Sequence, residues 1–176
     1  MKKIFCFCIV AAITGFNLSC KKTVEKLTEF DINYSSNVSV PSSSYTPSVP
    51  VDFDSPEIPT ESSTKFKAEN TAKDHIDEIK LNKFNISAVT GNLDAFKSVS
   101  IYLKSAGLTE VLIATKTSIP AGSTSVALDP QYPNLKDYIA KDKIQFRVTL
   151  TMSGGPTPEQ QIKMDQTLHV KAKLLK

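Results

Sequence analysis

The amino-acid sequence predicts a mainly-β chain that folds as an antiparallel β-sandwich. Apolar and polar residues alternate with a period of two along several stretches of the 176 residues. This alternation is typical of strands that bury one face and expose the other. Turn-forming residues separate the stretches, and only two short segments have helical spacing. Many short strands with few helices between them favour two packed antiparallel sheets.

The first predicted strand begins at Phe30. Phe30, Ile32 and Tyr34 alternate with polar residues, and Val38 and Val40 continue the same face. The pattern therefore predicts a long strand with one side on the core.

A proline-rich segment follows, because residues 41–60 hold five of the ten prolines. Proline cannot donate a hydrogen bond to a neighbouring strand, so the segment belongs at a sheet edge or in a loop. Val49, Val51 and Phe53 still alternate, which predicts a short edge strand. Disorder throughout the segment is the competing interpretation.

A short helix is expected next. Thr71 and Asp74 have the spacing of a capping box, which predicts about two helical turns from residue 70. Strand alternation resumes at Ile79 and changes parity after Leu81. A change of one residue predicts a β-bulge near residues 82–83.

Three more short strands are centred on residues 99–103, 111–113 and 126–128. Apolar residues at helical spacing then predict a second short helix over 134–141, crossing between the sheets. The clearest alternation covers 144–152 and 162–174, interrupted only by Gln166. With turn residues between them, these two segments predict a long hairpin.

About seven to nine strands with two short helical crossovers are similar in architecture to immunoglobulin-like sandwiches. The cysteine and tryptophan core of antibody domains is missing, since the chain has no tryptophan. The resemblance is therefore one of architecture alone.

Residues 1–19 have the organisation of an export signal. Lys2 and Lys3 precede an apolar segment, Ile4 to Phe16, and small residues follow it. The apolar segment is shorter than a membrane-spanning helix, which needs roughly 20 residues. We expect residues 1–19 to be a cleaved signal peptide.

Cysteine usage places Cys20 at the expected cleavage point. Cys6 and Cys8 lie inside the apolar segment, so Cys20 is the one cysteine left after cleavage. The run from Leu18 to Lys22 resembles the lipobox of bacterial lipoproteins, and its Cys-Lys-Lys continuation is similar to that of Bacteroidota-type envelope lipoproteins. Asn17 departs from the pattern, which usually has leucine there. An ordinary secreted protein cut near Ser19 is the alternative.

The lipoprotein resemblance implies that Cys20 is acylated and becomes the first residue of the mature chain. It also implies a palmitate-type anchor and the outer membrane, on either its periplasmic or its external face. Residues 20–27 would form a lipidated tether, and residues 28–176 the β-sandwich domain. Seven extended residues after Cys20 span roughly 25 Å, so the domain would lie close to the bilayer.

Three groups of side chains are candidate sites. His75 and Glu78 have metal-ligand spacing, although a solvated acidic helix face is the favoured interpretation. His169 falls on the polar face of the last strand. Whether Asp52, Asp54 and Glu57 hold a cation such as calcium stays open, because the segment lacks EF-hand order.

Loop tyrosines are the remaining candidates. Tyr45, Tyr132 and Tyr138 lie in or near loops and could form a ligand surface. Gly154 and Gly155 join two strands and indicate a turn rather than a phosphate cradle. The chain also lacks a nucleophile elbow, so no motif points to catalysis.

The expected function is that of a membrane-anchored envelope lipoprotein acting as a non-enzymatic structural or interaction module. A small-ligand or glycan-binding accessory lipoprotein is the alternative. An envelope protein or a glycan is the expected partner, and no cofactor or metal is expected. The formal charge of +3 and the single arginine, Arg147, argue against nucleic acid as a partner.

Overall fold

The computed structural model describes residues 29–173. The predictions for the signal peptide, the tether and Cys20 therefore lie outside the described residues, as does Leu174. Within residues 29–173 no helix has the length and apolarity that crossing a bilayer requires. The elements, in chain order, are β1 (Glu29–Val40), β2 (Pro50–Asp54), β3 (Ile58–Pro59), α2 (Ser62–Ala68), the 3₁₀ turn η2 (Lys73–His75), β4 (Ile76–Ala88), β5 (Phe96–Lys104), β6 (Val111–Lys116), β7 (Ser125–Ala127), β8 (Asp129–Pro130), α3 (Lys136–Ile139), β9 (Lys143–Met152) and β10 (Gln160–Ala172).

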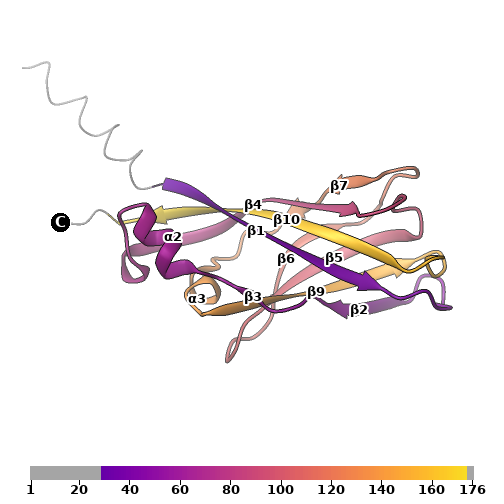
Figure 1. Cartoon of the computed structure of the whole chain (residues 1–176), viewed down its shortest axis with the longest axis horizontal. Coiled ribbons are helices and arrows are strands. Elements are labelled where there is room, and N and C mark those ends of the chain that lie inside the picture. The colour runs from indigo at the N-terminus through magenta and orange to yellow at the C-terminus, as the bar shows by residue number, and fades with distance from the viewer. Residues whose placement is uncertain (1–28, 174–176) are drawn as a thin grey trace, which may run out of the picture.

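The strands form two antiparallel sheets that pack face to face along the long axis of the molecule (Figure 1). The four-stranded sheet has the order β1-β10-β4-β7. The six-stranded sheet has the order β2-β9-β5-β6-β8, with β3 also paired to β9. The predicted mainly-β antiparallel sandwich with two short helices is confirmed.

One hydrophobic core fills the space between the sheets. Phe84 from β4 and Phe146 from β9 meet edge to face with their ring centroids 5.7 Å apart. This contact joins the two sheets directly, and such aromatic pairs add to the free energy gained from burial. The largest fully buried side chains are Phe66, Phe84, Phe146, Ile76, Ile79, Leu81, Ile86, Leu93, Ile101, Leu103, Ile113 and Leu135.

The two N-terminal strand predictions are confirmed. In β1, Ile32, Tyr34, Val38 and Val40 are all buried, as the alternation predicts. The proline-rich segment contains β2, which pairs with β9 and forms the edge of its sheet. The competing interpretation, disorder through this segment, is wrong for β2.

The bulge is also confirmed, at Asn82. Leu81 pairs with Leu168, and Lys83 pairs with the adjacent Thr167, which leaves Asn82 as the extra residue in β4. The bulge lets β4 keep apolar side chains on the core on both sides of the parity change.

The predicted position of the first helix, from residue 70, is wrong. The helix is α2, and the strand β4 already begins at Ile76. Between them, only the single turn η2 forms, without a side-chain cap. Thr71 makes no capping bond, because its buried hydroxyl has no hydrogen-bond partner in the described structure. The buried residues Ile76 and Ile79 belong to a strand paired with β10, and this pairing overrides the local capping signal.

The second helix, α3, is confirmed but shorter than predicted. It connects β8 and β9, which belong to the same sheet, so it does not cross between sheets. The amide of Leu135, just before α3, donates to the carbonyl of Ile79 and holds the helix against β4. Helix α2, in contrast, lies in a connection that does change sheets, the one from β3 to β4.

The predicted C-terminal hairpin is wrong. Both segments are strands, but β9 lies in the six-stranded sheet and β10 in the four-stranded sheet. The alternation only specifies which residues face the core, and both strands face the same core from opposite sides. Residues 153–159 therefore connect the two sheets instead of closing a two-stranded ladder.

Candidate functional site

A band of ion pairs covers the outer face of the six-stranded sheet. Asp54 lies 3.0 Å from Lys104 on β5, and Glu57 lies 2.8 Å from Lys143 on β9. Asp52 completes the band through Arg147 on β9. Asp52, Asp54 and Glu57 are the carboxylates for which the sequence left a calcium site open. Each of them instead pairs with a different basic side chain.

This pairing weakens the calcium hypothesis. A calcium site gathers several oxygen ligands around one point. Here the three carboxylates are directed to three separate cations, and residues 29–173 contain no group of three or more metal-ligating side chains. The arrangement ties neighbouring strands together instead.

Arg147 is the centre of the band. Its Nε and Nη2 atoms donate to the two carboxylate oxygens of Glu110, at 2.9 and 2.5 Å. Nη1 lies 2.9 Å from both Asp52 and Thr149. The guanidinium also lies over the ring of Tyr102, 4.0 Å from its centroid. A guanidinium with this many partners has little capacity left for a ligand.

The pKa shifts of three residues in the band agree with these contacts. The hydrogen bond from Arg147 is the main cause that lowers the pKa of Glu110 below its ordinary value. The bond to Glu110 in turn raises the pKa of Arg147. Hydrogen bonding to Glu57 raises the pKa of Lys143. These shifts favour the charged forms of Glu110, Arg147 and Lys143.

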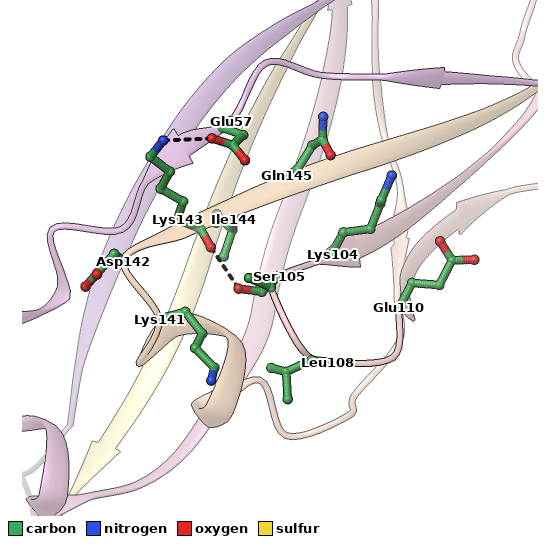
Figure 2. A pocket seen from close by; sticks show the side chains of 11 residues that line it. Glu57, Lys104, Ser105, Leu108, Glu110, Lys141, Asp142, Lys143, Ile144 and Gln145 are labelled. Carbon is green, nitrogen blue, oxygen red and sulfur yellow. Dashed lines mark hydrogen bonds and ion pairs between the residues drawn. The ribbon is translucent and has the colours of Figure 1, made fainter.

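A hollow with a volume of about 770 Å³ lies at one end of this band. Figure 2 shows it between the turn after β5 and the start of β9. Ser105 donates to the carbonyl of Lys143 at 2.8 Å, and Lys143 reaches Glu57 (Figure 2). Glu110 is committed to Arg147. The two glutamates in the lining are therefore both bound to bases, which is unfavourable for general acid and base work.

The histidine predictions have separate outcomes. His75 lies in η2, beside Asp74, whereas Glu78 lies in β4 and pairs with Lys80. The helical spacing that suggested a metal site does not exist, because the segment is not helical. His169 lies on the outer face of β10, as predicted, 2.9 Å from Asp31 on β1.

The tyrosines do not form one surface. Tyr45 packs edge to face on Phe53, and the hydroxyl of Tyr138 donates to the carbonyl of Thr109. Tyr132 is 67% exposed. None of the three lines any of the three described hollows.

The glycine pair lies in a turn, as predicted, but in a turn that connects the two sheets. A Cβ atom at Gly155 would overlap the carbonyl oxygen of Ser43, whereas one at Gly154 would meet nothing within 4 Å. Gly155 therefore allows the segment after β1 to lie against the β9–β10 connection.

Sequence reasoning missed two features. The Arg147 network joins residues that are far apart in the chain. Gln166 is a core residue that is only 3% exposed, and its amide has no hydrogen-bond partner in the described structure. The one available signal was its position on the apolar face of β10.

A scan against models of known protein families finds no match, and a search of curated proteins finds no relative.

Proposed function

We propose that the chain is a membrane-anchored cell-envelope lipoprotein whose sandwich acts as a non-enzymatic structural or interaction module. The observation that carries the proposal is Cys20, the one cysteine remaining after a short apolar export signal and directly after Leu18-Ser19. An acyl anchor there needs at least two chains for stable attachment, because each buried CH₂ contributes only about 0.8 kcal/mol. By resemblance to Bacteroidota-type lipoproteins, the location is the outer membrane.

The start of the sandwich fits such an anchor. β1 begins at Glu29, a short distance along the chain from Cys20. The segment that joins them spans roughly 30 Å when fully extended, at about 3.3 Å per residue. The beginning of β1 and the helix α2 lie at the same end of the molecule (Figure 1). An acylated Cys20 would therefore hold the beginning of β1 within roughly 30 Å of the bilayer.

A non-enzymatic role is supported by the band of ion pairs. Asp52, Asp54 and Glu57 are each bound to a base, and Arg147 is bound to both Asp52 and Glu110. Groups held in this way strengthen a surface but are poor nucleophiles or proton carriers.

A ligand- or glycan-binding accessory role is the second candidate. The exposed ring of Tyr132 is the one observation that favours it. Tyr45 and Tyr138 are used for packing and hydrogen bonding, so the proposed tyrosine surface would depend on Tyr132 alone.

The test compares Cys20→Ala with Cys8→Ala, the same change inside the apolar segment. After fractionation of the bacteria, we expect Cys20→Ala to leave the membrane fraction and Cys8→Ala to stay in it. Globomycin should cause an uncleaved precursor of the parent chain to accumulate. Mass spectrometry that finds an unacylated N-terminal peptide in native material would overturn the proposal.

A further inference from the structure

The free edges of the two sheets are protected to different degrees. Short edge strands, prolines and charges discourage pairing with other molecules. β2 has five residues and begins with Pro50, β7 has three residues, and β8 has two and ends with Pro130. β1 has 12 residues with no proline, no lysine and no bulge in its pairing with β10. It is the one edge strand longer than five residues in the described part of the chain, and its charged residues, Glu29 and Asp31, both lie at its beginning.

The outer edge of β1 has no strand beside it within residues 29–173. The whole of β1 pairs with β10 on one side, and no other described segment makes a backbone hydrogen bond to β1. Helix α2 touches β1 through two core-facing side chains, Phe30 and Tyr34. The side chains on the other face of β1 are all exposed, namely Glu29, Asp31, Asn33, Ser35, Asn37 and Ser39.

We propose that β1 pairs antiparallel with β1 of a second copy of this chain, which joins two four-stranded sheets edge to edge. A two-fold axis through Ser35 places Ser35 opposite its own equivalent and Asn33 opposite Asn37. It also places Asp31 opposite Ser39. A closed two-fold interface of this kind uses the same surface on both copies.

The distribution of charge along β1 favours antiparallel over parallel pairing of two copies. The two acidic residues of β1, Glu29 and Asp31, both lie at its beginning, and the exposed residues from Asn33 to Ser39 are uncharged. Antiparallel pairing therefore puts each acid near neutral asparagine or serine side chains, whereas parallel pairing would bring like charges together. Small polar side chains that face one another across strands also contribute hydrogen bonds.

The pairing goes beyond the proposed lipoprotein function and does not depend on it. It uses β1 alone, and the location of the chain can be followed in the same samples. A parent chain that forms no dimer although it is found in the membrane fraction would refute the pairing and leave the anchor intact.

The first test is disulfide trapping in membranes that hold the full chain. In the proposed register the two Cβ atoms at position 35 lie about 5 Å apart, close enough for Ser35→Cys to form a disulfide. Asn37→Cys is the matched control, because its equivalents are displaced by four residues, roughly 13 Å along the strand. The parent chain controls for Cys20.

After oxidation we expect at least about five times more dimer on a non-reducing gel for Ser35→Cys than for Asn37→Cys. Co-expressed copies with Asn33→Cys and Asn37→Cys should again form a dimer. Equal trapping of Ser35→Cys and Asn37→Cys, or trapping of Ser35→Cys to a different protein, would overturn the proposal.

The second test is sedimentation of the full chain in detergent. A lysine at Asn37 would lie at the interface, whereas a lysine at Asn85 would lie on the same sheet face in β4, which has strands on both sides. We expect Asn37→Lys to weaken dimerisation at least tenfold and Asn85→Lys to leave it unchanged. A parent chain that is monomeric at all concentrations would also refute the pairing.

Discussion

Both sheets of the sandwich have an edge strand fastened by ion pairs, since Asp31 of β1 lies 2.9 Å from His169 of β10, but the sheets differ in how their buried polar groups are paired. On the six-stranded sheet, Arg147 and Lys104 bind carboxylates from β2, so that the edge strand is fastened to β9 and β5 by charge as well as by its ladder. On the four-stranded sheet, the core side of β10 carries Gln166, whose amide has no hydrogen-bond partner among residues 29–173. In the same described part of the chain, the buried hydroxyl of Ser36 on the adjacent strand β1 also has no hydrogen-bond partner.

The two sheets also differ in how much unpaired strand backbone their edges leave for another molecule to bind. A short edge strand fixed by ion pairs leaves little backbone for another molecule to use. The long β1 edge lies beside unsatisfied polar groups in the core, and an unpartnered buried amide or hydroxyl costs free energy of folding. Within residues 29–173, the four-stranded sheet therefore combines the longest edge strand with the unpaired polar groups of Ser36 and Gln166.

The largest expected effect concerns the β9–β10 connection, where the chain passes from one sheet to the other. Gly155→Ala places a Cβ atom against the backbone of Ser43, and a backbone carbonyl cannot move aside as a flexible side chain does. We expect the free energy of unfolding to fall by about 1–3 kcal/mol, the usual range for overpacking. Urea denaturation of the purified chain measures this loss.

Gly154→Ala is the matched control for that prediction. A Cβ atom at Gly154 meets nothing within 4 Å, so the midpoint of denaturation should hardly change. Equal effects of the two alanine substitutions would show that the β9–β10 connection does not need the close approach at Gly155.

The strands could be predicted from the sequence because the direction of a side chain in a strand is a local property. The alternation in β1 and the parity change at Asn82 each depend on a few neighbouring residues, and both predictions are confirmed. Strand partners are not local. Segments 144–152 and 162–174 have patterns that suit a hairpin and suit opposite sheets equally well, and only the complete core decides between them.

The helix and the site were beyond prediction for similar reasons. α2 buries only Ser62 and Phe66, a pattern too short to stand out, while the capping signal at Thr71 is overridden by the pairing of β4 with β10. The partners of Arg147 come from β2 and from the residue before β6. No spacing in the sequence connects them, because the sheet order brings them together.

The second prediction tests the unpaired amide in the four-stranded sheet by comparing two buried glutamines of β10. The amide of Gln160 donates to the carbonyls of Thr90 and Asn92, whereas that of Gln166 has no partner in the described structure. Gln166→Met removes an unsatisfied group at similar volume, so we expect the free energy of unfolding to rise by about 1–2 kcal/mol. Thermal and urea denaturation both measure this change.

Gln160→Met is the control and should change stability in the opposite direction, because it leaves two carbonyl groups without their donor. A loss of stability in both variants would mean that the amide of Gln166 contributes to folding. The four-stranded sheet would then be as well satisfied in its core as the six-stranded sheet.

The smallest effect concerns the charge on the six-stranded sheet. Arg147 lowers the pKa of Glu110 below its ordinary value of 4.5, so the carboxylate stabilises the fold at higher pH. The contribution is present above the ordinary pKa and is lost as the pH falls through the lowered pKa of the folded state. Since Glu110 is largely exposed, we expect Glu110→Gln to cost only about 0.2–1 kcal/mol at neutral pH. The difference in stability from the parent chain should vanish in acid.

Asp137→Asn is the control, because it removes an exposed carboxylate outside the described ion pairs, and it should cost less than Glu110→Gln at every pH. Denaturation curves from acid to neutral pH measure both variants. A loss for Glu110→Gln that does not vary with pH would mean that the shape of the side chain, rather than its charge, holds Arg147 in place.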